Sequence, residues 1–296
     1  MRRRSLSKQK TVEALTAYLC LSPFLILFGV FTVYSVIHAF SMSFYDYNVF
    51  TTPIFIGLAN YIELFGSPLF RKAMANTFIY AVATVTLQTV FALLVANLLN
   101  QKIFGRAFFR AAFYVPAVTP SVVVSLIFTW MFFRDGIFNY ALNLLGIHSH
   151  IDWLNNVRAA LPAVIIVGVW SNVGRYMLMF LAGLQDIPRS VYEAAEIDGA
   201  SGFDAFRYMT VPLLRPIVTL VAILGAIGAF QVFTEIYIMT GGGPMDATTT
   251  VSYLIYINAF NYFRMGYASA IAWVLAFIIF AFSTAQRKLL DVEIYY

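Results

Sequence analysis

The chain has 296 residues, of which 61% are hydrophobic and only 11% are charged, and its mean hydropathy is +0.78. Soluble domains are roughly 45–50% apolar and about 25% charged, so this composition excludes an ordinary soluble enzyme, a disordered chain and a disulfide scaffold. It predicts a protein whose solvent is mostly membrane lipid.

Six stretches of the chain are apolar enough to cross a bilayer as helices, which takes about 20 residues each. They are Tyr18–Ser41, Thr77–Leu99, Ala112–Phe133, Leu161–Leu184, Leu213–Ile238 and Tyr267–Ala285. The first is too long for a removable signal peptide and lacks a small-residue cleavage site, so we interpret it as a retained anchor. We therefore expect an all-α membrane protein with six transmembrane helices within 17–288, a basic segment over 1–16 and a tail over 289–296.

The positions of lysine and arginine predict which side of the membrane each loop faces, because cytoplasmic loops are enriched in both. If the amino terminus is cytoplasmic, 13 basic residues share its side: Arg2, Arg3, Arg4, Lys8, Lys10, Lys102, Arg106, Arg110, Arg189, Arg207, Arg215, Arg287 and Lys288. Five lie opposite: Arg71, Lys72, Arg134, Arg158 and Arg264. We expect a multi-pass protein of the cell membrane with both termini cytoplasmic. This bias also explains the net charge of +5 without a nucleic-acid partner, since no basic stripe interleaves with exposed aromatic residues.

One polar connection, Asp186–Pro212, stands out between the fourth and fifth predicted spans. It is 27 residues long and holds five of the chain's 14 acidic residues. Ser190 and Glu193 have the spacing of a capping box, so a helix is predicted to begin there. Gly199 suits the left-handed position that ends a helix. Together these signals predict a short helix on the cytoplasmic face of the protein.

A second short helix is predicted from Ser201 with Asp204, and Pro212 either limits it or begins the next span. The apolar side chains of the two helices exceed what a solvated linker needs: Val191, Ala194, Ala195, Phe203 and Phe206. A helix that rests on lipid carries lysine and arginine on its polar face, whereas this one carries acidic residues: Glu193, Glu196 and Asp198. Acidic helices with a small-residue face favour docking into the groove of a basic protein partner.

The spacing of this loop resembles a known family. Glu193-Ala194-Ala195 is followed after three residues by Gly199, after nine more by Met209 and after one more by Val211-Pro212. This pattern resembles the EAA loop of ABC importer permeases, which has Ile and Leu where this chain has Met209 and Val211. Two further pairs of segments resemble the first permease subunit of maltose-type carbohydrate importers: Phe55–Tyr61 with Asn76-Thr77, and Gly242–Pro244 with Ala247–Thr250. The resemblance extends from Ser22 to Lys288.

The resemblance implies a maltose-type permease fold with a cytoplasmic coupling loop over 185–212, and a subunit that translocates a sugar or sugar-like solute. The sequence leaves open whether that solute is a sugar, a polyol or glycerol phosphate, and Arg175 slightly favours an anion. Its implied partners are a second homologous permease subunit, two cytoplasmic ATP-binding subunits that bind ATP and Mg²⁺, and an extracytoplasmic solute-binding protein, all assembled in membrane lipid. The residues implied in coupling to the ATPases are those of the loop: Glu193, Ala194, Ala195, Asp198, Gly199, Phe203 and Pro212. Glu193 is expected to contact the ATPase, and Gly199 to set the angle between the two short helices.

The chain itself carries no phosphate-binding loop of the kind that ends in Gly-Lys. Its five lysines follow serine, glutamine or arginine and never glycine. We therefore expect no enzymatic activity and no cofactor in this chain, and energy must come from a partner or from an ion gradient.

Polar groups within a span are candidates for the solute pathway, because they are costly in lipid. The fourth span contains Ser171, Asn172 and Arg175, and the fifth contains Gln231 and Glu235. The resemblance adds further positions, so that the predicted pathway comprises Trp170, Ser171, Asn172, Arg175, Gly225, Gly228, Ala229, Gln231 and Glu235. A rise of about 1.5 Å per residue puts Arg175 roughly 20 Å from the outer end of its span and Glu235 about 5 Å from the end of the next. The two side chains are therefore not expected to touch.

The small residues of the fifth span have a second interpretation. Ala222, Gly225, Ala226 and Ala229 have the spacing of close helix–helix packing. His148 and His150 lie in a loop and are too few for a metal site. The main alternative to an ABC importer is an ion-coupled secondary transporter, which often has a midplane acidic residue that this chain lacks. A membrane scaffold or enzyme subunit leaves Asn172 and Arg175 without a purpose.

Overall fold

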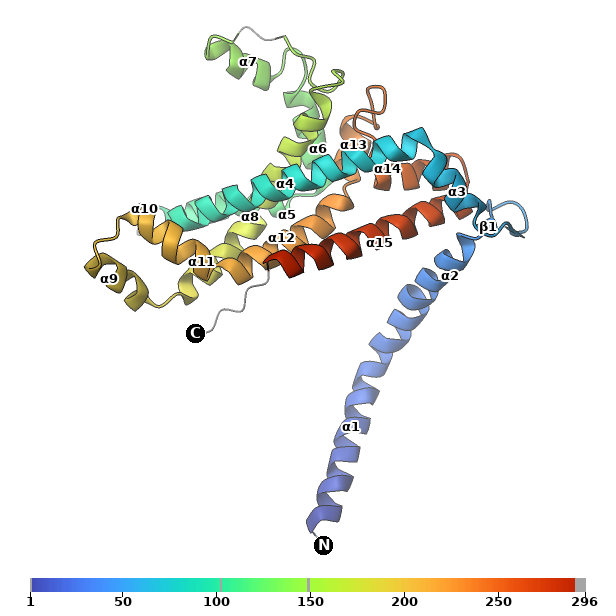
Figure 1. Cartoon of the computed structure of the whole chain (residues 1–296), viewed down its shortest axis with the longest axis horizontal. Helices are drawn as coiled ribbons and strands as arrows, with labels where there is room; N and C mark the ends of the chain where they lie inside the picture. The colour runs from blue at the N-terminus through green and yellow to red at the C-terminus, as the bar shows by residue number, and fades with distance from the viewer. Residues whose placement is uncertain (1, 102, 148–149, 291–296) are drawn as a thin grey trace. The chain divides into compact units, whose positions relative to one another are not determined.

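The computed structural model describes residues 2–101, 103–147 and 150–290, and Figure 1 shows the chain as a ribbon. The described residues form two compact units. The first comprises those of Met1–Leu64 and Asn258–Trp273, and the second comprises those of Phe65–Ile257 and Val274–Tyr296. Lys102, which was counted in the predicted orientation, and His148, which was considered as a metal ligand, lie outside the described residues. Most of the predicted tail also lies outside them.

The first unit contains the helical anchor predicted at the amino terminus. Helix α1 (Arg2–Leu27), a π-helical segment (Phe28–Val33) and α2 (Tyr34–Met42) follow one another without a break. Their apolar part, Leu15–Met42, is long enough to span a membrane, and none of its most apolar window is buried within the protein. This exposure is typical of a helix whose side chains face lipid or another subunit.

Polar contacts hold the rest of the first unit together. Strand β1 (Tyr45–Asp46) pairs antiparallel with β2 (Ile54–Phe55). The side-chain amide of Asn60 donates to the carbonyl oxygens of Ser43 and Tyr45, at 2.9 and 3.0 Å. Asn60 belongs to α3 (Ala59–Gly66), the helix that contains the end of the motif Phe55–Tyr61. This part of the resemblance therefore serves to fasten the turn that follows the anchor.

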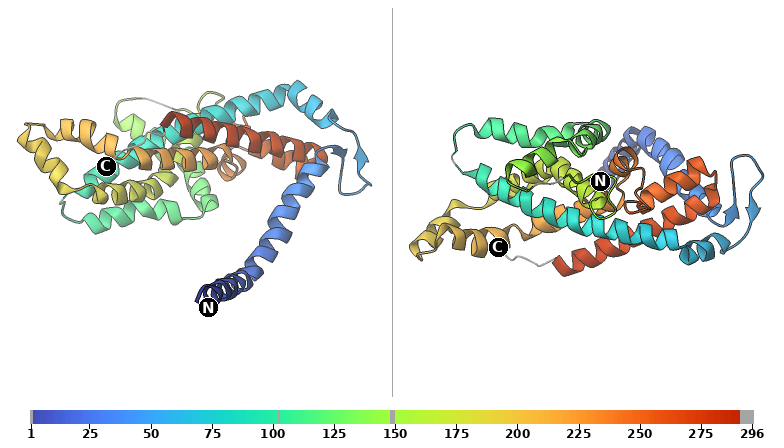
Figure 2. Two further views of the ribbon diagram at one scale, coloured as in Figure 1. Left: turned by 60° about the horizontal axis from the view of Figure 1, so that its bottom comes forward. Right: turned by 90° about the horizontal axis from the view of Figure 1, so that it is seen from above.

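The second unit is built around α8 (Ala160–Asp186), the most buried of its long helices. Helices α4 (Pro68–Asn100), α5 (Arg106–Val118) and α12 (Arg215–Phe230) pack against it. The last long helix, α15 (Met265–Leu290), belongs to this unit from Val274 onward. Figure 2 shows this arrangement from two further sides. Glycines of α8 permit the close approach, since a Cβ at Gly168 would lie 2.1 Å from the Tyr80 hydroxyl of α4, and one at Gly174 would lie 1.9 Å from the Phe113 carbonyl oxygen of α5.

By length and composition, the described chain has four helices that can cross a membrane, or up to six if each of two bent pairs counts as one span. The four are Leu15–Met42, Pro68–Asn100, Ala160–Asp186 and Met265–Leu290. Each contains or overlaps a predicted span, and the other two predicted spans fall on the bent pairs. The prediction of an all-α membrane protein is thus confirmed.

Two of the predicted spans are wrong as continuous helices. The span Ala112–Phe133 is divided into α5 and α6 (Ser121–Met131), which meet at 99°. Pro120 causes the break, because a residue before proline is disfavoured in the helical conformation, and Thr119 is extended with a ψ of 135°. The span Leu213–Ile238 is interrupted after Phe230, where α12 ends, and resumes as the short helix α13 (Thr234–Met239).

An ordered turn connects α13 to α14 (Val251–Tyr256) and fastens both to α4. The amide of Asn76 donates to the carbonyl oxygens of Asp246 and Thr249, each at 3.0 Å. The backbone N–H of Val251 donates to the hydroxyl of Thr77 at 2.9 Å. The two motifs Asn76-Thr77 and Ala247–Thr250, which are about 170 residues apart in the sequence, therefore contact each other directly. The remaining helix, α7 (Ile137–Leu144), and a π-helical segment (Ile257–Asn261) complete the described elements outside the polar loop.

Candidate functional site

The polar loop after α8 forms the two short helices that the sequence predicts. Helix α9 (Arg189–Ile197) is followed by α10 (Gly202–Ala205), a π-helical segment (Phe206–Thr210) and α11 (Val211–Leu213). Gly199 has a φ of +79°, and the N–H of Ala200 donates to the carbonyl of Ala195 at 2.9 Å, which closes α9 as a left-handed glycine does. The left-handed conformation predicted for Gly199 at the end of the helix is confirmed.

The predicted capping box of Ser190 and Glu193 is wrong. Helix α9 begins at Arg189, directly after Pro188, and the side chain at its amino end makes no capping hydrogen bond. Proline fixes φ near the helical value and so starts the helix without a serine cap. Glu193 instead pairs with Arg189 one turn earlier, with Nε and Oε1 3.0 Å apart. Both side chains are exposed, so the pair adds little stability, and the Glu193 carboxylate is accessible to a partner.

The capping box predicted for the second short helix is present. The hydroxyl of Ser201 donates to the Asp204 carboxylate at 2.5 Å, and the N–H of Asp204 donates to the Ser201 hydroxyl at 3.2 Å. The hydrogen bonds from Ser201 hold the pKa of Asp204 below its usual range. Pro212 does not end this helix, because it lies near the start of α11, where a missing N–H is tolerated. The chain bends by 66° at Leu214, beyond it.

The exposure of the loop separates its structural residues from those available to a partner. Ala195 is only 3% exposed and therefore packs inside the loop rather than on its surface, contrary to the expectation of an exposed small-residue face. The hydroxyl groups of Tyr192 and Thr210 are 3.0 Å apart and join α9 to the π-helical segment that continues α10. In contrast, Ile197 is 86% and Phe203 is 68% exposed. Glu193, Ala194 and Asp198 are exposed as well.

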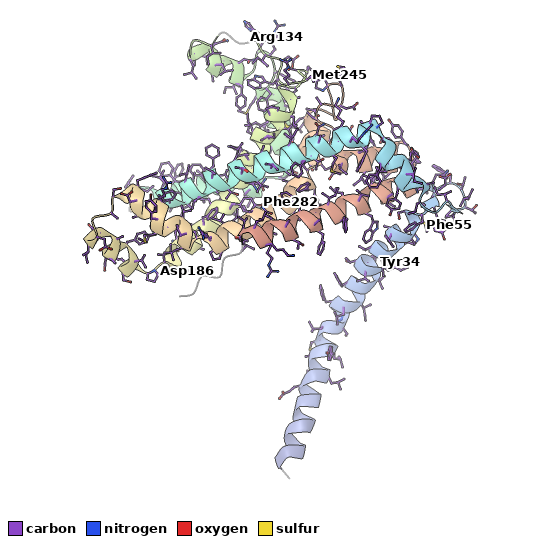
Figure 3. All side chains as sticks on the ribbon, in the orientation of Figure 1. Tyr34, Phe55, Arg134, Asp186, Met245 and Phe282 are labelled. Atoms are coloured by element: carbon purple, nitrogen blue, oxygen red, sulfur yellow. The ribbon has the colours of Figure 1, made fainter. Side chains whose placement is uncertain are left out.

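The loop lies at one end of the second unit. Figures 1 and 3 show α9 and α10 beyond the carboxyl end of α8, which Asp186 marks. The carboxyl end of α15 approaches the start of α12 at the same end, where the hydroxyl of Thr219 donates to the Leu290 carbonyl at 3.4 Å. The basic residues of the described chain at this end include Arg189, Arg207, Arg215, Arg287 and Lys288.

A polar cavity of about 230 Å³ lies between α4, α8 and α12. Its lining includes seven of the nine residues predicted for the solute pathway: Asn172, Arg175, Gly225, Gly228, Ala229, Gln231 and Glu235. Arg175 forms no hydrogen bond or ion pair with any other residue that the structure describes. The cavity thus combines a guanidinium, a carboxyl group and side-chain amides, which are groups that bind hydroxyls and carboxylates.

The depth argument that separated Arg175 from Glu235 is wrong in part. No ion pair joins them among the described residues, as expected, but both line the same cavity. The argument assumed a continuous fifth span, and rise per residue no longer measures depth once a helix is broken. Because α12 ends at Phe230, the chain turns through Gln231–Phe233 and brings Glu235 to the cavity.

The structure adds two polar residues of α4 to the cavity, Thr84 and Gln88. Sequence reasoning about the pathway considered only the fourth and fifth spans and missed both. The rule that polar groups within a span are candidates for function would have identified Gln88, since it lies in the middle of an apolar stretch.

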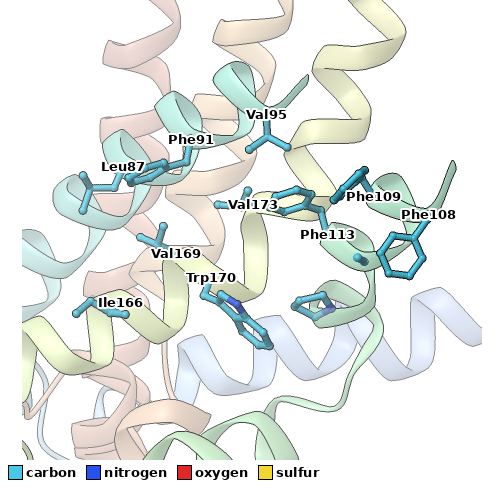
Figure 4. Close-up of a pocket in the computed structure, with 12 residues that line it drawn as sticks. Leu87, Phe91, Val95, Phe108, Phe109, Phe113, Ile166, Val169, Trp170 and Val173 are labelled. Atoms are coloured by element: carbon cyan, nitrogen blue, oxygen red, sulfur yellow. The ribbon is translucent and has the colours of Figure 1, made fainter. Parts of the chain in front are cut away.

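Trp170 and Ser171 do not line the polar cavity. Trp170 lies on a separate apolar groove of about 650 Å³. Figure 4 shows its ring among the other side chains of that groove, which include Leu87, Phe91, Phe109, Phe113, Ile166, Val169 and Val173. The Trp170 ring also packs edge-on against Phe128, with ring centroids 5.1 Å apart. The neighbours of Trp170 in this groove offer a hydroxylated solute no polar partner, and Ser171 lines neither the groove nor the polar cavity. The structure thus does not bring these two residues to the other seven.

Helices that can span a membrane, a polar cavity between them and a structured polar loop at one end define a multi-span transport protein. Residues 88–290 match the family described as the binding-protein-dependent transport system inner membrane component. The chain belongs to this family, whose members are permease subunits rather than enzymes.

Relatives and solved structures agree with this assignment. The chain is 41% identical over 271 residues to the probable ABC transporter permease protein YesP of Bacillus subtilis (strain 168), covering 90% of this chain and 87% of that protein. It is 36% identical over 287 residues to the trehalose/maltose transport system permease protein MalF of Thermococcus litoralis, covering 95% and 96%. Its fold matches a chain of a bacterial ABC transporter involved in the import of the acidic polysaccharide alginate, with a TM-score of 0.82, 21% identity and coverage of 97% and 98%.

Proposed function

We propose that this chain is a permease subunit of an ATP-driven importer that moves a neutral sugar, delivered by an extracytoplasmic binding protein, into the cell. The observation that carries the proposal is the structured loop between α8 and α12. It exposes apolar side chains at Ile197 and Phe203 beside the carboxylates of Glu193 and Asp198. Exposed apolar groups next to charges are the usual composition of a protein-docking surface, and the loop has the spacing of the EAA motif.

Coupling would proceed through the short helices of this loop. Closure of two cytoplasmic ATPases would move α9 and α10, and the ordered connection through α11 would transmit the movement to α12 and α8 as rigid bodies. The hydrogen bond between Tyr192 and Thr210 supports this role, because it joins α9 to the π-helical segment that continues α10 and lets them move together. The second permease subunit would complete the pathway opposite this chain.

The orientation follows from the same assignment. The loop and the carboxyl end of α15 lie at one end of the second unit, together with a group of arginines and lysines. Cytoplasmic ends of spanning helices are rich in these residues, so this end, with the carboxyl terminus, is assigned to the cytoplasm. The amino terminus is assigned to the same side on the basis of its five basic residues within 1–16.

The cavity supports a neutral rather than an anionic solute. Arg175 alone would favour an anion, but the Glu235 carboxyl lines the same cavity and, in its ionised form, offsets the charge of the guanidinium. The amides of Asn172 and Gln231 can donate and accept hydrogen bonds, as sugar hydroxyls require. The relative of Thermococcus litoralis, named for trehalose and maltose, supports this solute class.

The experiment is to purify the chain with an affinity tag from its own cells and identify the bound proteins. An ATPase, a second permease and binding-protein-stimulated ATP hydrolysis are expected. Gly199→Val is expected to retain assembly but to lose coupling between hydrolysis and uptake, because a β-branched residue is strained at a φ of +79°. Gly199→Asn, which tolerates this conformation, serves as the matched control. Uptake driven by a proton or sodium gradient without any ATPase would refute the proposal and indicate an ion-coupled secondary transporter.

A further inference from the structure

We propose that Gln88 of α4 is a solute-contacting residue that selects for a hydroxyl group of the sugar, and that Gly225 of α12 holds its amide in the cavity. This inference rests on the proposed function and adds a third helix to the pathway. Gln88 lies outside the polar loop and outside the fourth and fifth spans, from which the other site residues were predicted.

Gln88 is buried, yet its amide lacks a partner within the protein. The residue is only 2% exposed and lines the polar cavity. It forms no hydrogen bond with any residue in the described part of the chain, and its amide atoms are not among those fully sealed from solvent. An amide left unpaired away from solvent would cost about 1–3 kcal/mol, but this one opens into the cavity, so a molecule held there can satisfy it. Water fills this role between transport cycles, and the solute replaces it.

Gly225 determines where this amide lies. A Cβ at Gly225 would be 2.5 Å from the amide nitrogen of Gln88 and 3.7 Å from the Tyr176 hydroxyl. The first distance is shorter than real Cβ atoms essentially ever show, so the amide would have to move. The atom that a methyl group would displace is the end of a side chain rather than backbone. Gly225→Ala is therefore expected to move the amide while leaving the packing of α12 on α4 in place.

The chemistry of an amide suits a hydroxyl group better than a charged group. A glutamine amide offers two donor hydrogens and one acceptor oxygen, so it can donate to and accept from the same hydroxyl. A site that hydrogen-bonds a hydroxyl rejects the analogue without it, because the buried amide is then left unpaired. The cavity of about 230 Å³ is smaller than the roughly 300–1,000 Å³ of drug-sized ligand sites, which favours one sugar unit at a time.

The test uses the complete transporter, purified with its copurifying subunits and reconstituted in proteoliposomes that enclose ATP. Uptake of a panel of radiolabelled neutral disaccharides and one hexuronate by the wild type identifies the imported sugar. Uptake of this sugar is then compared with that of its monodeoxy analogues. Gln88→Met, which preserves side-chain length, is expected to lower uptake at subsaturating sugar by roughly 5- to 30-fold, the loss of one or two hydrogen bonds.

The deciding measurement is how strongly each variant prefers the parent sugar over its monodeoxy analogues. One monodeoxy analogue is expected to be imported less well than the parent sugar by the wild type and equally well by Gln88→Met. Gly225→Ala should reproduce this change, and it should have no further effect in the Gln88→Met background, since the two act through one amide. Gly29→Ala, where a Cβ would meet nothing within 4 Å, is the matched control.

The possible outcomes are distinct. If the wild type imports a neutral sugar and Gln88→Met retains its preference for every hydroxyl, the role of Gln88 is refuted and the proposed function stands. If the wild type imports only the hexuronate, or no sugar, both are overturned. If Gln88→Met fails to assemble, Gln88→Leu replaces it, since its side chain neither donates nor accepts a hydrogen bond, and an unchanged discrimination by this variant refutes the inference.

Discussion

Replacing Gly174 with alanine should destabilise the protein, because the chain has no room for one additional methyl group at this position. An ideal Cβ would lie 1.9 Å from the carbonyl oxygen of Phe113, 2.7 Å from its carbonyl carbon and 2.9 Å from the Cα of Tyr114. All three atoms belong to the backbone of α5, so no side-chain rotation can relieve the clash. Ordinary contact begins near 3.4 Å, which requires α5 and α8 to separate by about 1.5 Å.

The expected cost follows from two opposing effects. Overpacking a buried site costs about 1–3 kcal/mol, and a backbone clash belongs at the upper end of this range. Alanine recovers up to about 1 kcal/mol through its higher helix propensity. The net loss is about 2 kcal/mol, which corresponds to a thermal midpoint lower by roughly 4–8 °C.

The assay is thermal unfolding of the full chain in lipid nanodiscs. Gly228→Ala is the matched control, since it adds the same methyl group to a helix of the same unit where a Cβ would meet nothing within 4 Å. Its midpoint should equal or slightly exceed that of the wild type. Equal midpoints for Gly174→Ala and Gly228→Ala would refute the reasoning that the α5–α8 contact depends on glycine.

Two further predictions concern single polar anchors. Asn76→Ala should lower stability by about 1–3 kcal/mol and increase protease cleavage within 240–250, because it leaves the carbonyls of Asp246 and Thr249 without their donor. Asn76→Asp should be no more stable, since a carboxylate cannot donate. Full protection from the protease in either variant would contradict the assignment. The carboxylate of Glu63 lies 2.6 Å from Nη2 of Arg264, and this contact lowers the pKa of Glu63 below its ordinary value of 4.5. A lowered pKa in the folded state contributes stability that is present above pH 4.5 and is lost as the pH falls through the folded-state pKa. The wild type should therefore be more stable than Glu63→Gln at pH 7, by less than about 1 kcal/mol because both side chains are about half exposed, and this difference should vanish in acid. A difference in stability that persists in acid would exclude the ion pair as its cause.

The sequence predicted the helices that are uniform in composition and failed where a single proline or a short polar interruption divides them. Apolar length alone located Pro68–Asn100 and Ala160–Asp186 well. Apolar length alone cannot reveal that the chain turns by 99° at Pro120 or that α12 ends at Phe230, because apolar residues resume beyond each break and the two pieces are read as one span. The predicted capping box failed for a related reason, since Pro188 begins α9 without help from Ser190.

The candidate cavity was only partly accessible to sequence reasoning. Arg175, Gln231 and Glu235 were identified as polar residues within spans, and the cavity unites them. Gln88 was missed because α4 was considered only as an apolar span. Trp170 was selected because of its position in a motif. A single sequence does not reveal which face of α8 this residue occupies, and in the structure it lines the apolar groove.

The break in α12 depends on hydrogen bonds from the residues around the start of α14. Non-helical backbone at membrane depth persists only where its polar groups are satisfied or line a cavity. The break at Gln231–Phe233 meets both conditions. The hydroxyl of Thr250 donates to the carbonyl of Val232 at 3.2 Å, that of Ser252 donates to the carbonyl of Phe230 at 3.4 Å, and Gln231 lines the cavity. The same turn is fastened to α4 by Asn76. Helix α4 is therefore connected to the cavity in two ways, directly through Gln88 and indirectly through the turn that holds the break in α12. We expect a displacement of α4 to be felt at the cavity through both connections.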